Sequence, residues 1–199
     1  MGGNMKDESI IQPKWGLNWK RPKAKKFNEN WAVEEETANF LYGITKMVKP
    51  LRFLEIGTFE GTSAGAIGQA MKENGHGKIW TIDYKDYGQE GFMKELGLEE
   101  QVKCVIGELP ESVINIVKEE GQQFDMAFID DGHAFEDALR DIVSCHPVIR
   151  KYGYIMGHDV INVPDVARAL DTFLAEHSKE YEKVIIASYD GLFILRKLI

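Results

Sequence analysis

Short apolar runs alternate with amphipathic stretches along most of the chain. The strand-like runs cover residues 53–56, 79–83, 102–106, 126–130 and 154–158. Helical patterns cover residues 33–48 ahead of the first run, and then 62–73, 88–97, 110–119 and 135–149. Strands and helices in strict alternation predict an α/β protein, with a parallel sheet and helices on both faces.

The C-terminal part of the chain, from residue 166, changes character. A helix is predicted over residues 166–180, followed by apolar runs at 184–188 and 192–196. Tyr189-Asp190-Gly191 separates these runs, and Asp-Gly between two apolar runs is a strong signal for a β-hairpin. The sheet is therefore expected to end in an antiparallel hairpin, within a single domain.

Composition limits the classes of protein to consider. The 199 residues fit one domain, and 44% hydrophobic with 28% charged residues is typical of a globular chain. No apolar run approaches the roughly 20 residues that cross a bilayer. Cys104 and Cys145 are expected to be buried, reduced thiols, and no paired Cys or His spacing indicates a zinc site. We expect a cytoplasmic protein, and the net charge of −8 argues against a nucleic-acid partner.

The first 31 residues carry the opposite charge from the rest. They hold seven Lys or Arg against three acids, which leaves −12 for residues 32–199, and they contain Trp15, Trp19 and Trp31. Interleaved basic and aromatic residues can bind RNA. Because the body is acidic, we favour an arm or lid that packs over it, or that crosses to a second copy in a homo-oligomer.

The turn after the first strand carries the clearest functional signal. Gly57 and Gly61 lie between a buried strand and a helix, where glycine lets the backbone approach a ligand closely. Asp83 ends the next strand, where a carboxylate can accept hydrogen bonds from ribose hydroxyls. A nucleoside-containing cofactor is therefore expected.

The residues within the turn favour one class of cofactor over another. A dinucleotide fingerprint requires a middle glycine, but position 59 is Phe59. Glu55 and Glu60 are poor neighbours for a pyrophosphate and suit a cationic ligand. S-adenosylmethionine carries an ammonium and a sulfonium, whereas an NAD-dependent oxidoreductase is the less favoured alternative.

The run from Glu55 to Ser63, Glu-Ile-Gly-Thr-Phe-Glu-Gly-Thr-Ser, resembles the first motif of class I S-adenosylmethionine-dependent methyltransferases. The likeness is greatest to metal-dependent O-methyltransferases of the catechol and macrolide-sugar type, and Trp31-Ala-Val-Glu34-Glu35-Glu36 is similar to the segment that precedes their motif. The resemblance extends to the C-terminus. It implies a Rossmann-like, doubly wound sheet of five parallel strands closed by an antiparallel hairpin, with adenine near the end of the third strand. The expected cofactor-binding residues are Glu55, Gly57, Thr58, Phe59, Gly61, Ser63, Asp83, Tyr84, Gly107, Glu108 and Asp130.

Acids after the fourth and fifth strands suggest a metal site. Asp130 and Asp159 follow apolar runs, and His158 precedes Asp159. Hard oxygen ligands suit Mg²⁺. In the resembled family acids occupy all these places, so His158 is a departure that makes Mn²⁺ or Fe²⁺ more plausible. The expected ligands are Asp130, Asp159 and His158.

His133 follows Asp130 by three residues, the offset at which the resembled enzymes carry a basic residue. An imidazole there can take the proton of an acceptor hydroxyl. The sequence thus predicts an O-methyltransferase for a small hydroxylated acceptor, with His133 as general base. A non-catalytic S-adenosylmethionine-binding regulator remains the alternative. His76, His146 and His177 are expected to be structural or exposed.

Overall fold

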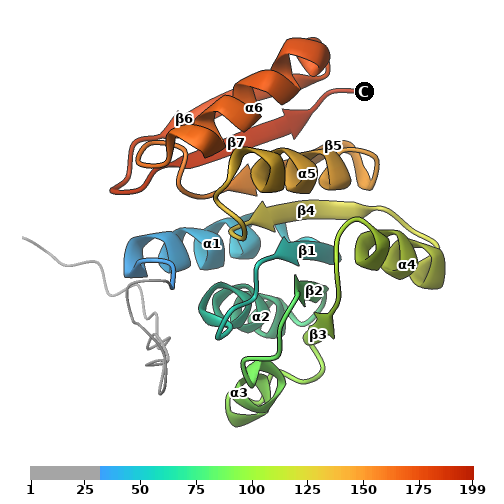
Figure 1. Cartoon of the computed structure of the whole chain (residues 1–199). Helices are drawn as coiled ribbons and strands as arrows, with labels where there is room; N and C mark the ends of the chain where they lie inside the picture. The colour runs from blue at the N-terminus through green and yellow to red at the C-terminus, as the bar shows by residue number, and fades with distance from the viewer. Residues whose placement is uncertain (1–31) are drawn as a thin grey trace, which may run out of the picture.

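The computed structural model describes residues 32–199 (Figure 1). The arm predicted for residues 1–31 lies outside this range. Seven strands of the described chain form one sheet in the order β3-β2-β1-β4-β5-β7-β6. They are β1 (Arg52–Ile56), β2 (Lys78–Asp83), β3 (Val102–Ile106), β4 (Phe124–Ile129), β5 (Ile149–Gly157), β6 (Tyr181–Ile186) and β7 (Leu192–Lys197).

Strand directions match the expected layout. β1 to β5 pair in parallel, whereas β7 runs antiparallel to both β5 and β6. The Asp-Gly signal marks the turn between β6 and β7, where Gly191 adopts a φ of 83°. The prediction of a Rossmann-like sheet of five parallel strands with a C-terminal hairpin is therefore confirmed.

Helices cover both faces of the sheet (Figure 1). They are α1 (Glu35–Val48), α2 (Thr62–Asn74), α3 (Gln89–Glu95), α4 (Glu111–Glu120), α5 (Phe135–Cys145) and α6 (Pro164–His177). Side chains of α1, α2 and α3 pack around Phe53, and those of α4, α5 and α6 pack around Leu54 and Ile56. Successive strand residues point to opposite faces, so one strand contributes to both cores. None of the described helices is long and apolar enough to cross a membrane.

Element boundaries in the second half of the chain differ most from the sequence-based prediction. The fifth helix was expected to reach residue 149, but α5 ends at Cys145 and β5 already begins at Ile149. Pro147 has no N–H to continue a helix. The predicted helix over 166–180 and strand over 184–188 are likewise displaced, because α6 ends at His177 and Tyr181 pairs with Lys197 of β7. Tertiary pairing with β7 thus starts β6 three residues early.

The fold brings the ends of β1 and β4 together. β1 lies between β2 and β4, so the chain leaves the sheet in opposite directions from β1 and β4. Asp130 N donates to Ile56 O at 2.8 Å. A Cβ at Gly57 would lie 1.9 Å from Asp130 O, so only glycine fits where the turn after β1 passes the backbone at the end of β4. In open α/β sheets ligands bind at this point, outside the carboxyl ends of the strands.

Candidate active site

A cavity of about 350 Å³ opens at the carboxyl ends of β1, β2, β4 and β5. Four aspartates from the strand ends and Asp190 of the hairpin turn give it an acidic lining. Phe59, Tyr84 and Tyr87 form an aromatic part of the wall, with 5.0 Å between the ring centroids of Phe59 and Tyr87. The lining residues are Ala32, Val33, Gly57, Phe59, Asp83, Tyr84, Tyr87, Asp130, Asp131, His133, His158, Asp159 and Asp190.

The turn after β1 holds the carboxylate of Asp83 in place. Gly57, Phe59 and Gly61 all adopt positive φ angles, of 90°, 45° and 91°. This path points the N–H of Phe59 at Asp83 Oδ2, which accepts at 2.8 Å, while Asp83 Oδ1 accepts from Lys85 N at 3.1 Å. Each carboxylate oxygen has a second lone pair. Asp83 is thus fixed in position and retains capacity to accept from a ligand.

Glu55 lies beneath the cavity and does not line it. It is fully buried on β1 and accepts a hydrogen bond from Thr81, the residue opposite it on β2. Burial raises the pKa of Glu55 to about 8, against hydrogen bonds from Ser63 and Thr81 that lower it. A carboxyl with this pKa is mostly neutral near pH 7. The acidic character of the cavity therefore comes from the aspartates that line it, and the expectation that Glu55 faces a cationic ligand is not met.

The other residues of the first motif border a smaller space. A cavity of about 20 Å³ adjoins the main one and is lined by Thr58, Thr62 and Ser63 together with residues of the main cavity. Thr58 Oγ1 lies 2.5 Å from Thr81 Oγ1, in the same buried network as Glu55. Gly61 is the N-cap residue of α2 and adopts a left-handed backbone conformation. These residues shape the cavity floor and the start of α2.

Gly107 and Glu108 do not reach the cavity wall. Gly107 N donates to Asp83 O at 2.9 Å, which joins the ends of β2 and β3, whereas Glu108 is exposed. Glu108 O accepts from Ser112 N at the start of α4. The expectation that adenine lies at this strand end stays a prediction.

His158 connects the two metal-candidate acids to the first described helix. Its Nε2 lies 2.8 Å from Glu34 Oε2, and its Nδ1 lies 3.6 Å from Asp130 Oδ1 and 3.3 Å from Asp159 Oδ2. Burial by itself would lower the pKa of His158, because it disfavours the charged ring. The hydrogen bonds and negative charges of Asp130 and Asp159 outweigh this and raise the pKa to about 11. His158 is thus a buried ring held between three carboxylates.

His133 reaches the same acids from the loop after β4. Its Nε2 lies 2.5 Å from Asp159 Oδ2, and this hydrogen bond raises the pKa of His133 above its ordinary value. Asp159 adopts a φ of 64°, and both histidines hold its pKa well below the usual range despite its burial. Ligand atoms of Asp130, His133 and Asp159 lie within 4.8 Å of one another. The structure therefore brings together every residue that the sequence suggested for the metal and the base.

Four polar residues of the site were missed by the sequence analysis: Glu34, Tyr87, Asp131 and Asp190. Glu34 belongs to the segment noted for its resemblance, but no role was assigned to it. Asp131 lines the cavity, and burial together with the charge of Asp83 raises its pKa. Asp190 comes from the hairpin turn, which was read only as a turn signal. Strand-end rules do not predict which later loop folds over the site.

Comparison with known proteins assigns the family. A methyltransferase-domain family matches residues 54–160. A tapetum-specific methyltransferase of Arabidopsis thaliana is 27% identical over 183 residues, which cover 84% of this chain and 78% of the relative. A caffeoyl-CoA O-methyltransferase of Populus kitakamiensis is 25% identical over 187 residues, with the same coverage.

The fold is shared with solved methyltransferase structures. An O-methyltransferase of Streptomyces achromogenes involved in tomaymycin synthesis, solved in complex with S-adenosylmethionine, aligns with a TM-score of 0.72 and 18% identity. The alignment covers 86% of this chain and 83% of that one. The matched family segment contains the glycine turn, Asp83, Asp130 and Asp159. The expected resemblance is confirmed: the chain belongs to the methyltransferase-domain family and is a class I S-adenosylmethionine-dependent methyltransferase.

Proposed function

We propose that the protein transfers the methyl group of S-adenosylmethionine to the hydroxyl of a small acceptor. The observation that carries the proposal is the acidic, partly aromatic cavity of about 350 Å³ at the carboxyl ends of the strands. This size lies within the roughly 300–1,000 Å³ of small-molecule sites. The similarity to caffeoyl-CoA O-methyltransferase supports an oxygen acceptor.

The cavity suits the charge and shape of the cofactor. Asp83 would accept from the ribose hydroxyls through its remaining lone pairs. Carboxylates of Asp130 and Asp159 give a negative potential that favours the ammonium and sulfonium groups. The rings of Phe59 and Tyr87 offer faces to the adenine or to a cationic group. We propose these residues, with Gly57, as the main cofactor contacts.

The residues at the ends of β4 and β5 fit a divalent cation. Metal-bound histidines commonly donate their second ring N–H to a carboxylate, and His158 has this arrangement with Glu34. Its Nδ1 faces Asp130 and Asp159 at 3.6 and 3.3 Å, about the spacing of neighbouring ligands on one ion. We propose Asp130, His158 and Asp159 as the ligands, with Mg²⁺ or Mn²⁺ as the ion. A bound cation would make an acceptor hydroxyl more acidic.

His133 is proposed as the general base. Asp159 accepts from one ring nitrogen and fixes the orientation of the imidazole, which leaves Nδ1 to accept a proton from the acceptor hydroxyl. His133 is about half exposed, so the proton can pass on to solvent. Asp159 would thus serve both the ion and the base.

Turnover of methyl-labelled S-adenosylmethionine with a panel of catechols, caffeoyl-CoA and other hydroxylated acceptors tests the proposal. Labelled methyl ether, identified by mass spectrometry, is the expected product. Transfer to nitrogen or sulfur with no ether product would contradict the oxygen specificity, and bound cofactor without any turnover would favour a regulatory module.

A further inference from the structure

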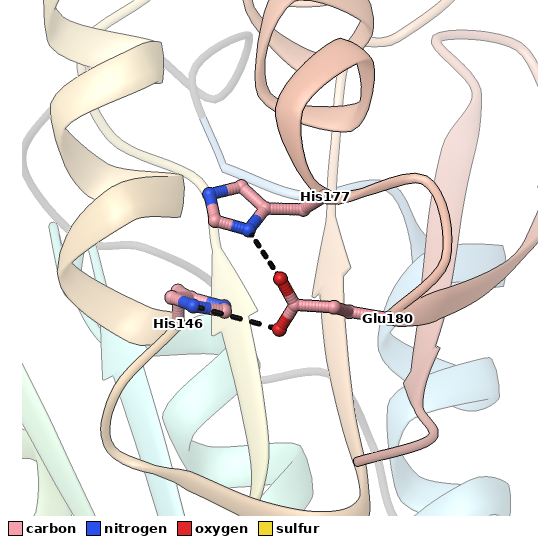
Figure 2. Close-up of side chains that lie close together, drawn as sticks. All are labelled: His146, His177 and Glu180. Carbon is pink, nitrogen blue, oxygen red and sulfur yellow. Dashed lines mark hydrogen bonds and ion pairs between the residues drawn. The ribbon is translucent and has the colours of Figure 1, made fainter.

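A second cluster of titratable side chains lies at the amino end of the parallel strands, away from the cavity. His146 follows α5, His177 ends α6, and Glu180 precedes β6 (Figure 2). β5 starts at Ile149 near this cluster and ends at Gly157 near the cavity, so the length of β5 separates the two sites. The methyl-transfer chemistry proposed above uses none of the three residues.

The three side chains point toward one another, with the carboxylate of Glu180 facing both rings (Figure 2). Glu180 Oε1 lies 2.8 Å from His177 Nδ1, and Glu180 Oε2 lies 3.9 Å from His146 Nε2. One ligand atom from each residue lies within 4.8 Å of the others. Ligands about 2.1 Å from a tetrahedral zinc ion stand about 3.4 Å apart, within the 4.8 Å span of these three atoms.

Tyr181 holds the ring of His146 in an orientation that suits a metal ligand. Its Nδ1 lies 2.8 Å from Tyr181 Oη, so a partner orients the ring and leaves Nε2 toward Glu180. Burial lowers the pKa of His146, and the charges of Lys197 and His177 act in the same direction. Nε2 of His146 thus faces the carboxylate of Glu180 and can bind an ion beside it.

Lys197 adds a positive charge near the cluster, but its ammonium donates to backbone carbonyl oxygens and not to the candidate ligand atoms. Its Nζ donates to His146 O at 2.8 Å and to Ile149 O at 3.1 Å. The three candidate ligands are 24%, 25% and 27% exposed, so an ion can enter and a water can complete its coordination. Two imidazole nitrogens and one carboxylate favour Zn²⁺ over Mg²⁺.

We propose that His146, His177 and Glu180 form a transition-metal site that takes Zn²⁺. The ion would join the ends of α5 and α6 to the start of β6, and so fasten the C-terminal hairpin to the helical layer beside it. The proposed ligands come from the ends of two helices and the start of one strand. The first and last of them, His146 and Glu180, are 34 positions apart in the sequence. An ion at this junction would therefore stabilise the folded chain.

Calorimetric titration of the full chain with ZnCl₂ tests the proposal, in a D130N/D159N background that removes two of the three ligands proposed for the catalytic cavity. One equivalent of Zn²⁺ should bind. Adding His177→Gln should weaken the affinity by at least about tenfold, since it removes a ligand. Adding His76→Gln, at an exposed histidine outside both clusters, is the matched control and should change nothing.

No Zn²⁺ binding in the background variant, or an affinity unchanged by His177→Gln, would overturn the proposal. Ring nitrogen NMR of the wild-type chain gives a second measurement that needs no substitution. The chain has five histidines. Zn²⁺ should shift the ring signals of His146 and His177, and a response confined to His133 and His158 would overturn the proposal as well.

Discussion

The two ends of the parallel strands both carry histidines beside carboxylates, but the chain builds them differently. At the carboxyl end the groups follow strands β4 and β5 directly and line an open cavity. Five aspartates line this cavity, and one of them, Asp159, contacts both His133 and His158 and adopts a left-handed backbone conformation. At the amino end one carboxylate faces two histidines that come from helix ends, with Tyr181 and Phe173 packed against the rings.

This difference separates two kinds of chemistry. An excess of carboxylates attracts a cationic cofactor and hard cations, and the open cavity admits a substrate. Two imidazoles with one carboxylate form a compact set that suits one softer ion. Changes at the carboxyl end should therefore alter methyl transfer, whereas changes at the amino end should alter metal content and stability alone.

Removal of divalent cations is expected to have the largest effect. Chelator treatment should abolish methyl transfer while leaving S-adenosylmethionine binding largely intact, and Mg²⁺ or Mn²⁺ should restore the rate. Steady-state turnover and calorimetry measure the two effects. Zn²⁺ bound at the amino end would also be removed, so His177→Gln serves as the control and should keep wild-type turnover before chelation. Full activity in metal-free protein would return Asp130 and Asp159 to acceptor-binding roles.

His133→Ala should lower kcat by roughly 10²–10⁴-fold, the usual contribution of positioned proton transfer. Its hydrogen bond to Asp159 raises the pKa of His133, so the wild-type rate should rise with pH through a limb above the ordinary imidazole range. The limb should vanish in the variant, while cofactor affinity hardly changes. His76→Ala is the matched control. Near-normal kcat in His133→Ala would mean that the acceptor proton leaves to water.

Asp83→Ala should weaken S-adenosylmethionine binding by roughly 1.5–3 kcal/mol, because it removes hydrogen bonds to a charged acceptor. Asp83 also accepts from Phe59 N and Lys85 N, so part of the loss would reflect a looser turn. Asp86→Ala, three residues later and exposed, is the control for charge in the same loop. Equal losses in both variants would indicate a general electrostatic effect without ribose recognition.

Glu55→Gln tests the buried neutral carboxyl through its effect on stability. The folded pKa of about 8 lies above the unfolded value of 4.5, so the folded state holds the extra proton between these values. The contribution of Glu55 is therefore fully present below about pH 4.5 and is lost as pH rises through 8. Each unit of pKa difference corresponds to about 1.4 kcal/mol, so the free energy of unfolding should decrease by a few kcal/mol, in order of magnitude, over this pH range.

Denaturant unfolding between pH 5 and 8 measures this effect. The unfolding free energy of the wild type should fall more steeply with pH than that of Glu55→Gln. Parallel curves would show that Glu55 is already ionised at neutral pH, and would restore it as a direct source of charge for the cofactor.

The carboxyl end could be predicted from the sequence because one rule governs it. Parallel strands end at a common edge, so Asp83, Asp130 and Asp159 could be placed together from apolar runs alone. The charge state of Glu55 could not be predicted in this way, because it depends on Thr81 of the neighbouring strand and on complete burial of the carboxyl group. Glu34 and Asp190 reach the site because distant segments pack together in the fold, and the hydrophobic periodicity of a segment does not predict such long-range packing.

The amino end gave no comparable signal. His146, His177 and Glu180 follow no metal-ligand spacing, and two of them were expected to be structural or exposed. Their approach depends on where α5 and α6 end, and element boundaries are the least certain part of a sequence-based prediction. The early start of β6 at Tyr181, which brings Tyr181 to His146, has the same origin.

Hydrogen–deuterium exchange with and without S-adenosylmethionine tests the central claim most directly, because it locates the cofactor in the chain. Cofactor binding should slow amide exchange in residues 57–63, 83–88 and 130–133 and leave exchange in residues 177–181 unchanged. Protection confined to the amino end, or binding that leaves the three strand-end segments unprotected, would contradict it.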